Sequence, residues 1–97
     1  MDELQELQAW YASQCDEDWE HTYGVTIETL DNPGWMLKVD LRDTELEGRS
    51  FEPMGRGDSE DDADWIHCKV EKEQFIGCGG AGNLSELLRV FLKWAGV

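Results

Sequence analysis

The chain has 97 residues, of which 22 are Asp or Glu and eight are Lys or Arg, so its formal net charge at pH 7 is −14. This length fits one domain over residues 1–97, and a hydrophobic content of 40% with five tryptophans supplies a core that a disordered acidic tail would lack. The negative charge excludes nucleic acid and anionic membranes as partners, because both require a surplus of cations, and it favours a basic protein partner.

The N-terminal sequence MDELQELQAW lacks the positive charge and apolar run of a secretion signal. No stretch approaches the roughly 18–20 apolar residues of a membrane helix. The three cysteines, Cys15, Cys68 and Cys78, are an odd number without CxxC spacing, which favours free thiols over a disulfide framework. We therefore expect a cytoplasmic protein, with the oligomeric state left open and a monomer favoured.

Residues 2–14 predict an amphipathic helix. Asp2 with Gln5 three positions later forms a capping pattern at its start. The apolar side chains recur at helical spacing and form one stripe: Leu4, Leu7, Trp10 and Tyr11.

From residue 23 the hydrophobic period changes to two. Residues 23–30 and 35–42 alternate between apolar and polar side chains, and the turn sequence Asp31–Gly34 separates them. This pattern predicts a β-hairpin, with the face that carries Val, Ile, Trp and Leu in the core.

The segment that follows carries weaker signals. Residues 47–49 suggest a tight turn that leads into a short strand near Ser50–Pro53, and residues 55–64, with the sequence GRGDSEDDAD, predict a solvated loop. Trp65–Val70 and Gln74–Cys78 then predict a second hairpin around residues 71–73.

Residues 78–82 are rich in glycine and predict a flexible joint before a last helix. Asn83 with Glu86 forms a capping pattern, and six apolar residues follow at helical spacing: Leu84, Leu87, Leu88, Phe91, Leu92 and Ala95. The expected fold class is therefore α+β, an antiparallel sheet of four to five strands flanked by an N-terminal and a C-terminal helix.

The sequence contains no motif that specifies a reaction, so we expect no catalytic residue, metal site or cofactor. The glycines at 79–82 lack the Lys of a phosphate-binding loop, and the Cys, His and acidic residues at 15–21 lack the spacing of a zinc or calcium site. His67 and Cys68 are neighbours in a predicted strand and point to opposite faces, so they cannot form a nucleophilic pair.

Two segments combine carboxylates with a large aromatic residue, a composition typical of docking surfaces for basic proteins. We single them out as candidate binding sites, with Trp19 as a candidate anchor: Asp16, Glu17, Asp18, Trp19 and Glu20, and Glu60, Asp61, Asp62, Asp64 and Trp65. The alternative interpretation is that the acids form a solvated surface and the tryptophans belong to the core.

Several long segments of the sequence are similar to those of the bacterial immunity protein 53 family. They span nearly the whole chain: Leu7-x-x-Trp10-Tyr11-x3-Cys15-Asp16-x-Asp18-Trp19-Glu20-His21-x-Tyr23-Gly24-Val25, the run from Thr29 to Trp35, the run from Asp64 to Cys68, and Phe75-x-Gly77-x-Gly79-Gly80 leading into Asn83-Leu84. One departure is Ala81, where the family pattern has Pro.

This resemblance implies a small cytoplasmic protein of bacterial polymorphic toxin systems that binds a cognate toxin domain and neutralises it without catalysis. The charge of −14 suits a toxin with a basic active site, such as a nuclease. Two alternatives stay open at this point: a small thiol- or metal-dependent enzyme that uses Cys15 or Cys78, and a general acidic regulatory module without a toxin partner.

Overall fold

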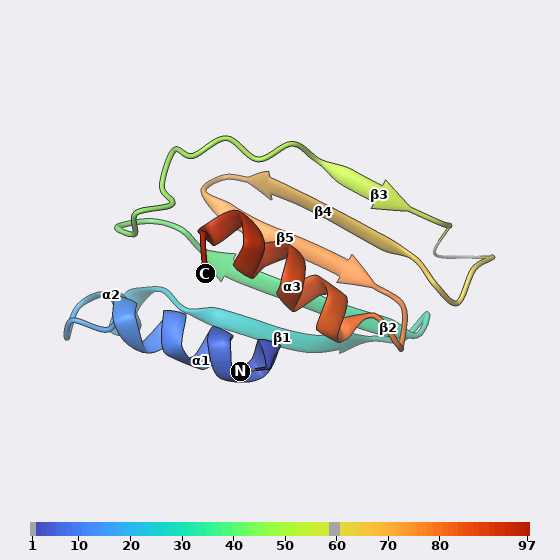
Figure 1. Ribbon diagram of the computed structural model, residues 1–97, viewed down its shortest axis with the longest axis horizontal. Helices are drawn as coiled ribbons and strands as arrows, with labels where there is room; N and C mark the ends of the chain where they lie inside the picture. Colours follow the sequence, from blue (N-terminus) through green and yellow to red (C-terminus); the bar gives the residue numbers. More distant parts are fainter. Residues whose placement is uncertain (1, 59–60) are drawn as a thin grey trace.

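The computed structural model describes residues 2–58 and 61–97 and shows an α+β fold (Figure 1). The elements follow one another in this order: α1 (Glu3–Gln14), α2 (Trp19–Thr22), β1 (Val25–Leu30), β2 (Gly34–Asp40), β3 (Met54–Arg56), β4 (Ile66–Glu71), β5 (Gln74–Gly79) and α3 (Leu84–Ala95).

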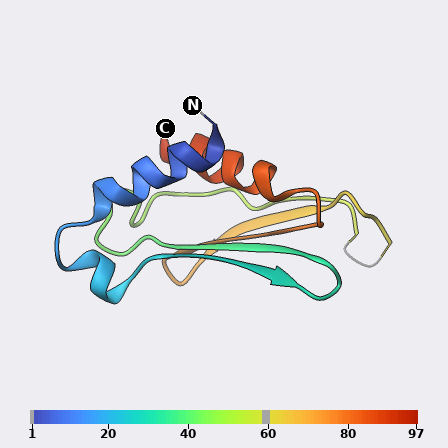
Figure 2. The same cartoon turned by 90° about the horizontal axis from the view of Figure 1, so that it is seen from below.

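The five strands form one antiparallel sheet in the order β1-β2-β5-β4-β3. The two long helices, α1 and α3, lie side by side on one face of this sheet (Figure 2). The predicted fold class, with an antiparallel sheet and a helix at each end of the chain, is confirmed.

The core lies between the helix layer and the sheet. Phe91 of α3 sits at its centre, where its ring packs edge-on against Trp10 of α1 at 5.0 Å between centroids and against Phe75 of β5 at 5.3 Å. The predicted stripe of α3 is confirmed, because its central members are all buried: Leu87, Leu88, Phe91 and Leu92.

The predicted helix at 2–14 is confirmed, including its capping box between Asp2 and Gln5. Its predicted stripe is only half buried, however. Leu7 and Trp10 face α3 and the core, whereas the side chains of Leu4 and Tyr11 are 55% and 38% exposed. The reason is position: α1 lies along the edge strand β1, where the sheet ends (Figure 1).

Both predicted hairpins are present. In the first, the strand begins at Val25, two residues after the alternation starts, because the short helix α2, which the sequence did not predict, precedes it. The expected core face is correct: Leu37 and Val39 are buried on it, and Ile27 points to the same face, although its side chain is 38% exposed because it lies on the edge strand.

The predicted strand near Ser50–Pro53 is wrong. The predicted loop over residues 55–64 is also wrong at residues 55 and 56, which belong to a strand. The third strand is Met54–Arg56, which pairs with β4 at the other edge of the sheet. The segment before it serves the core instead: Phe51 packs edge-on against Phe75, and the Ser50 carbonyl accepts a hydrogen bond from the Trp94 indole at 2.8 Å. Pro53 has no N–H to give to a strand ladder.

The turn between β4 and β5 suggests a stabilising substitution. Its two residues, Lys72 and Glu73, have φ of 53° and 59°, the left-handed backbone of a type I′ turn, which favours Asn-Gly. We expect the double substitution Lys72→Asn, Glu73→Gly to raise the free energy of unfolding by about 1 kcal/mol, measured by urea denaturation, because it relieves backbone strain.

A control pair, Lys72→Ala with Glu73→Ala, removes the same side chains and keeps the strain. It should show no such gain. Equal stability of the two double variants would contradict the assignment of the gain to the turn backbone.

Candidate functional site

The two acidic segments singled out from the sequence lie at opposite ends of the molecule. Residues 16–20 lie around α2 at one end of the long axis, and residues 61–65 follow the far loop at the other end (Figures 1 and 2). The molecule measures 42 Å along this axis. The structure therefore presents two separate acidic regions instead of one.

Near α2, two of the carboxylates hold the backbone in place. Asp16 accepts hydrogen bonds from the N–H groups of Trp19 (2.9 Å) and Asp18 (3.0 Å), and these bonds keep the pKa of its carboxyl below the usual value. Glu20 accepts from the N–H groups of Asp16 (2.9 Å) and Glu17 (2.8 Å). The pKa of Glu20 is also lowered, by its own backbone N–H first and then by those two. Both groups therefore shape the loop and stay ionised.

Glu17 and Asp18 occupy the tip of the same loop and are exposed. Glu17 has φ of 78°, a left-handed conformation that is uncommon for a residue with a side chain. The hydrogen bonds made by the neighbouring Asp16 and Glu20 hold it there. The fold thus keeps two carboxylates pointing outward at this end.

A second acidic segment, residues 43–47, meets this loop. Asp43 lines a pocket of about 220 Å³ together with Asp16 and Asp18. Glu45 accepts a hydrogen bond from the Trp10 indole N–H at 3.2 Å. We call the combined surface the acidic end and define it by seven residues: Asp16, Glu17, Asp18, Glu20, Asp43, Glu45 and Glu47.

Sequence reasoning missed the members at 43–47. The available signal was three acids at alternate positions in DTELE, directly after the first hairpin. What joins them to the loop is a tertiary contact, because the Trp19 indole N–H donates to the Arg42 carbonyl at 2.9 Å. Spacing along the chain does not reveal such a contact.

Trp19, singled out as a candidate anchor for a partner, is buried in this structure. Its side chain is only 2% exposed, and its ring packs edge-on against Trp10, with 6.0 Å between centroids. Trp19 therefore belongs to the core and supports the acidic end from below. This agrees with the alternative interpretation of the tryptophans.

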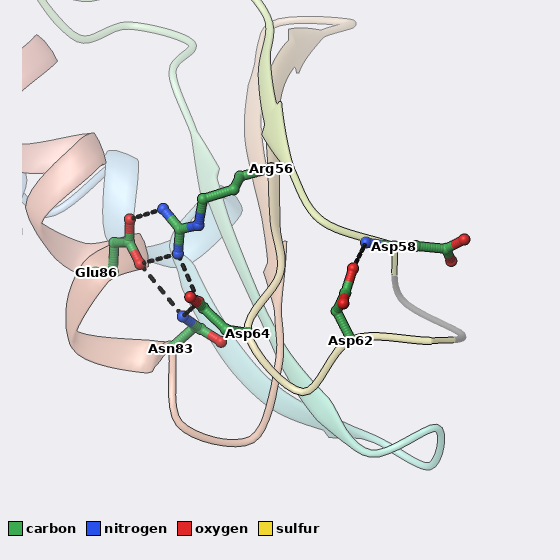
Figure 3. A network of polar contacts seen from close by, with 6 residues as sticks. All are labelled: Arg56, Asp58, Asp62, Asp64, Asn83 and Glu86. Carbon is green, nitrogen blue, oxygen red and sulfur yellow. Dashed lines mark hydrogen bonds and ion pairs between the residues drawn. The ribbon is translucent and has the colours of Figure 1, made fainter.

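At the opposite end, the described part of the second candidate segment is Asp61, Asp62, Asp64 and Trp65; Glu60 lies outside the described residues. Trp65 is buried, at 4% exposed, so it is also a core residue. Asp61 and Asp62 are exposed, and the Asp62 carboxylate accepts from the N–H of Asp58 at 2.8 Å (Figure 3).

Asp64 is engaged in a network that ties this loop to α3 (Figure 3). The Arg56 guanidinium lies 2.6 Å from Asp64 Oδ1 and 2.6 Å from Glu86 Oε2, and it lowers the pKa of both carboxyls. Asn83 lies at the predicted cap position of α3, but its side chain makes no cap. Instead its amide donates to Asp64 at 2.8 Å and to Glu86 at 3.2 Å.

The predicted flexible joint before α3 is wrong at Gly79 and Gly80, which are buried. The N–H of Gly80 donates to the Trp65 carbonyl at 3.0 Å, and a side chain at Gly80 would collide with the Ala63 carbonyl. Glycine is needed here because the chain passes so close to the 63–65 backbone.

Replacing Arg56 with Met should loosen this loop. We expect faster amide exchange at Gly80 in Arg56→Met than in the parent protein at pH 7, measured by NMR. The pKa values of Asp64 and Glu86 are lowered in the folded protein. Their ion pairs with Arg56 therefore stabilise the loop fully at a pH above the usual carboxyl pKa values, and this stabilisation is lost as the pH falls through the lowered pKa values. The difference in Gly80 exchange rate between Arg56→Met and the parent protein should therefore become smaller below about pH 4.

Arg56→Lys retains the charge without the guanidinium fork and should give intermediate exchange. If exchange at Gly80 does not respond to either substitution, the network does not hold the loop.

Two of the three cysteines are poor nucleophiles. Cys68 is buried on the core face of β4, as predicted, and burial raises the pKa of its thiol to about 12. Burial also raises the pKa of Cys78. Thiols of this kind are protonated at neutral pH and react slowly. Cys15 is exposed.

Within residues 2–58 and 61–97, no cluster of three or more His, Cys, Asp or Glu side chains has the arrangement of a metal site. In the same part of the chain, none of the helices combines the length and apolar character needed to cross a membrane.

A family model described as immunity protein 53 matches residues 4–96. The chain belongs to the immunity protein 53 family. The resemblance found in the sequence is thus confirmed. Neither the curated proteins nor the solved structures gave a match.

Membership of this family assigns the chain a toxin-neutralising role, in which an immunity protein binds a cognate toxin. For such a protein the relevant question is which surface meets the toxin. The two candidates are the acidic end, which contains the predicted segment 16–20, and the described part of the predicted segment 60–65.

Proposed function

We propose that this immunity protein neutralises its toxin by docking the acidic end against a basic substrate-binding groove of the kind found in a nuclease. It acts in the cytoplasm, where its three free cysteines suit a reducing environment. The observation that carries the proposal is the meeting of the 16–20 loop with residues 43–47 in one surface of seven carboxylates.

The geometry of this surface supports electrostatic docking. Glu17 and Asp18 are exposed at the loop tip, and the lowered pKa of Asp16 and Glu20 keeps those carboxylates charged. A cluster of carboxylates on one surface resembles the phosphates of a nucleic acid in charge. Complementary charge of this kind raises association rates and directs a partner to the correct face.

The size of a standard protein interface favours contact with one end of the molecule and not with both. A standard protein interface covers about 800 Å² of each partner, roughly 30 Å across. The acidic end and the 61–65 loop lie at opposite ends of a molecule 42 Å long, so one such interface does not include both. We choose the acidic end because it holds more described carboxylates and keeps two of them at an exposed loop tip.

The test uses the cognate toxin domain. Nuclease activity of the purified toxin is titrated with the immunity protein. Occlusion predicts complete inhibition at one immunity protein per toxin, with affinity that falls as salt rises. Inhibition by far less than one equivalent would indicate catalysis on the toxin, and a toxin without a basic groove would contradict the nuclease assignment.

A further inference from the structure

Strand β1 leaves one edge of the sheet open. It is the outermost strand and, among the described residues, pairs with β2 alone. The Asp40 N–H donates to the Gly24 carbonyl at 3.0 Å, which sets the phase of the antiparallel ladder. Since hydrogen-bonded positions alternate, Thr26 and Glu28 direct their backbone groups toward β2, and three residues direct theirs outward: Val25, Ile27 and Thr29.

An apolar groove runs beside this edge. Leu7, Gln8 and Tyr11 of α1 line a pocket of about 220 Å³ together with Val25. Tyr11 is one of the large exposed apolar side chains, and two others lie on the same two elements, Leu4 on α1 and Ile27 on β1.

The apolar side chains of β1 point toward the helix layer but stay partly exposed, because the described part of the chain places no strand beyond β1. Helix α1 lies along β1 (Figure 1) on the face that also carries α3 (Figure 2). The side chains of Val25 and Ile27 point to the same face as the buried Val39 and Leu37, to which they are paired. One further strand beside β1 would pass beneath α1 and would bury the side chains of Val25 and Ile27 in the core.

Natural edge strands are commonly protected by Pro, by Lys or by a bulge. The six residues of β1, VTIETL, contain neither Pro nor Lys, and their register with β2 is continuous from Val25 to Leu30. The strand is therefore suited to strand addition, in which backbone hydrogen bonds supply affinity and pockets select alternate side chains.

We propose that β1 accepts an extended cationic segment of the toxin as a sixth strand, with apolar side chains at alternate positions beneath α1. This rests on the proposed function and names a second contact with the same partner. The partner is cationic because residues 1–37, which include α1, α2 and β1, contain nine acids and no Lys or Arg. A second copy of the chain is disfavoured, because pairing two β1 strands would bring two segments of the same negative charge together.

A defined probe tests the edge directly. The seven-residue peptide of alternating lysine and valine, KVKVKVK, is added to the protein, and amide exchange is followed by NMR. We expect the amides of Val25, Ile27 and Thr29 to exchange quickly in the free protein and about tenfold more slowly when nine-tenths of the protein is bound. A peptide of alternating lysine and proline has the same charge and cannot form a ladder, so it should give no protection.

The substitution Thr29→Pro removes one outward N–H and leaves the ladder to β2 intact, because Pro is tolerated at an edge. It should abolish peptide protection, whereas Thr29→Val should retain it. Far-ultraviolet circular dichroism checks the fold, and Ile27→Pro replaces the first variant if that one does not fold.

Three results would overturn the inference. The first is peptide binding without protection of the β1 amides, and the second is equal protection by the lysine–proline peptide. The third is concentration-dependent protection in the free protein, which would assign the edge to a second copy. None of them affects the acidic end, which is tested separately by toxin inhibition.

Discussion

Association with the toxin should slow by about tenfold to a hundredfold when Glu17 and Asp18 are both replaced by lysine. These two residues are the informative pair because they lie exposed at the loop tip. Asp16 is less suitable, since its carboxylate holds the Trp19 and Asp18 N–H groups. Stopped-flow kinetics at low and high salt measure the effect, and the dependence of the rate on salt should flatten at the same time.

The matched control reverses two exposed acids, Asp31 and Asp61, and changes the net charge by the same amount. They belong to the β1–β2 turn and to the loop before β4, and both segments lie at the end opposite α2 (Figure 1). The control should alter the association rate far less. If instead this control slows association and the first variant does not, the toxin binds the end that carries the 61–65 loop.

Replacing Trp19 with Ala should lower the free energy of unfolding by about 3–5 kcal/mol, measured by urea denaturation. The indole is buried against Trp10 and Tyr11, and its N–H links α2 to the 42–47 segment. The substitution thus removes core volume and also the contact that assembles the acidic end. Loss of toxin binding by this variant should follow loss of structure.

Trp19→Phe is the matched variant, because it keeps a ring in the core and loses the indole hydrogen bond to the Arg42 carbonyl. We expect a loss of about 1–2 kcal/mol and an association rate close to that of the parent. If Trp19→Ala retained parental stability and only sped toxin dissociation, Trp19 would be a contact residue after all.

The elements with strong local signals were predictable from the sequence. The first hairpin has alternation on both sides of Asp31–Gly34, and the last helix has an unbroken apolar stripe. In both cases the pattern within one continuous segment determines the structure. Prediction succeeded there because local preference and tertiary packing agree.

The parts that sequence reasoning missed depend on contacts between distant residues. Two distant contacts decide that Met54–Arg56 forms the strand and Ser50–Pro53 does not. Phe51 packs into the core near Trp94, and Arg56 pairs with Glu86, thirty residues later. Asn83 has the residue type of a cap, but Asp64 and Glu86 engage its amide. No local pattern contains this information.

The candidate site shows the same division. Composition identified the carboxylates at 16–20 as a charged surface, but only the fold shows that residues 43–47 join them. It also separates the acids that hold the backbone, Asp16 and Glu20, from those at the loop tip. The burial of Trp19 could not be read from its neighbours in the sequence, all of which are polar.

The packing of α1 against α3 has a consequence for the order of events during synthesis. Trp10 completes its contacts only with Phe91, and Glu3 pairs with Arg89, 86 residues later. A growing chain therefore exposes the apolar side of its first helix until the last helix has left the ribosome. An immunity protein built in this way completes its fold only after translation is nearly finished, so we expect chains truncated before α3 to offer no protection.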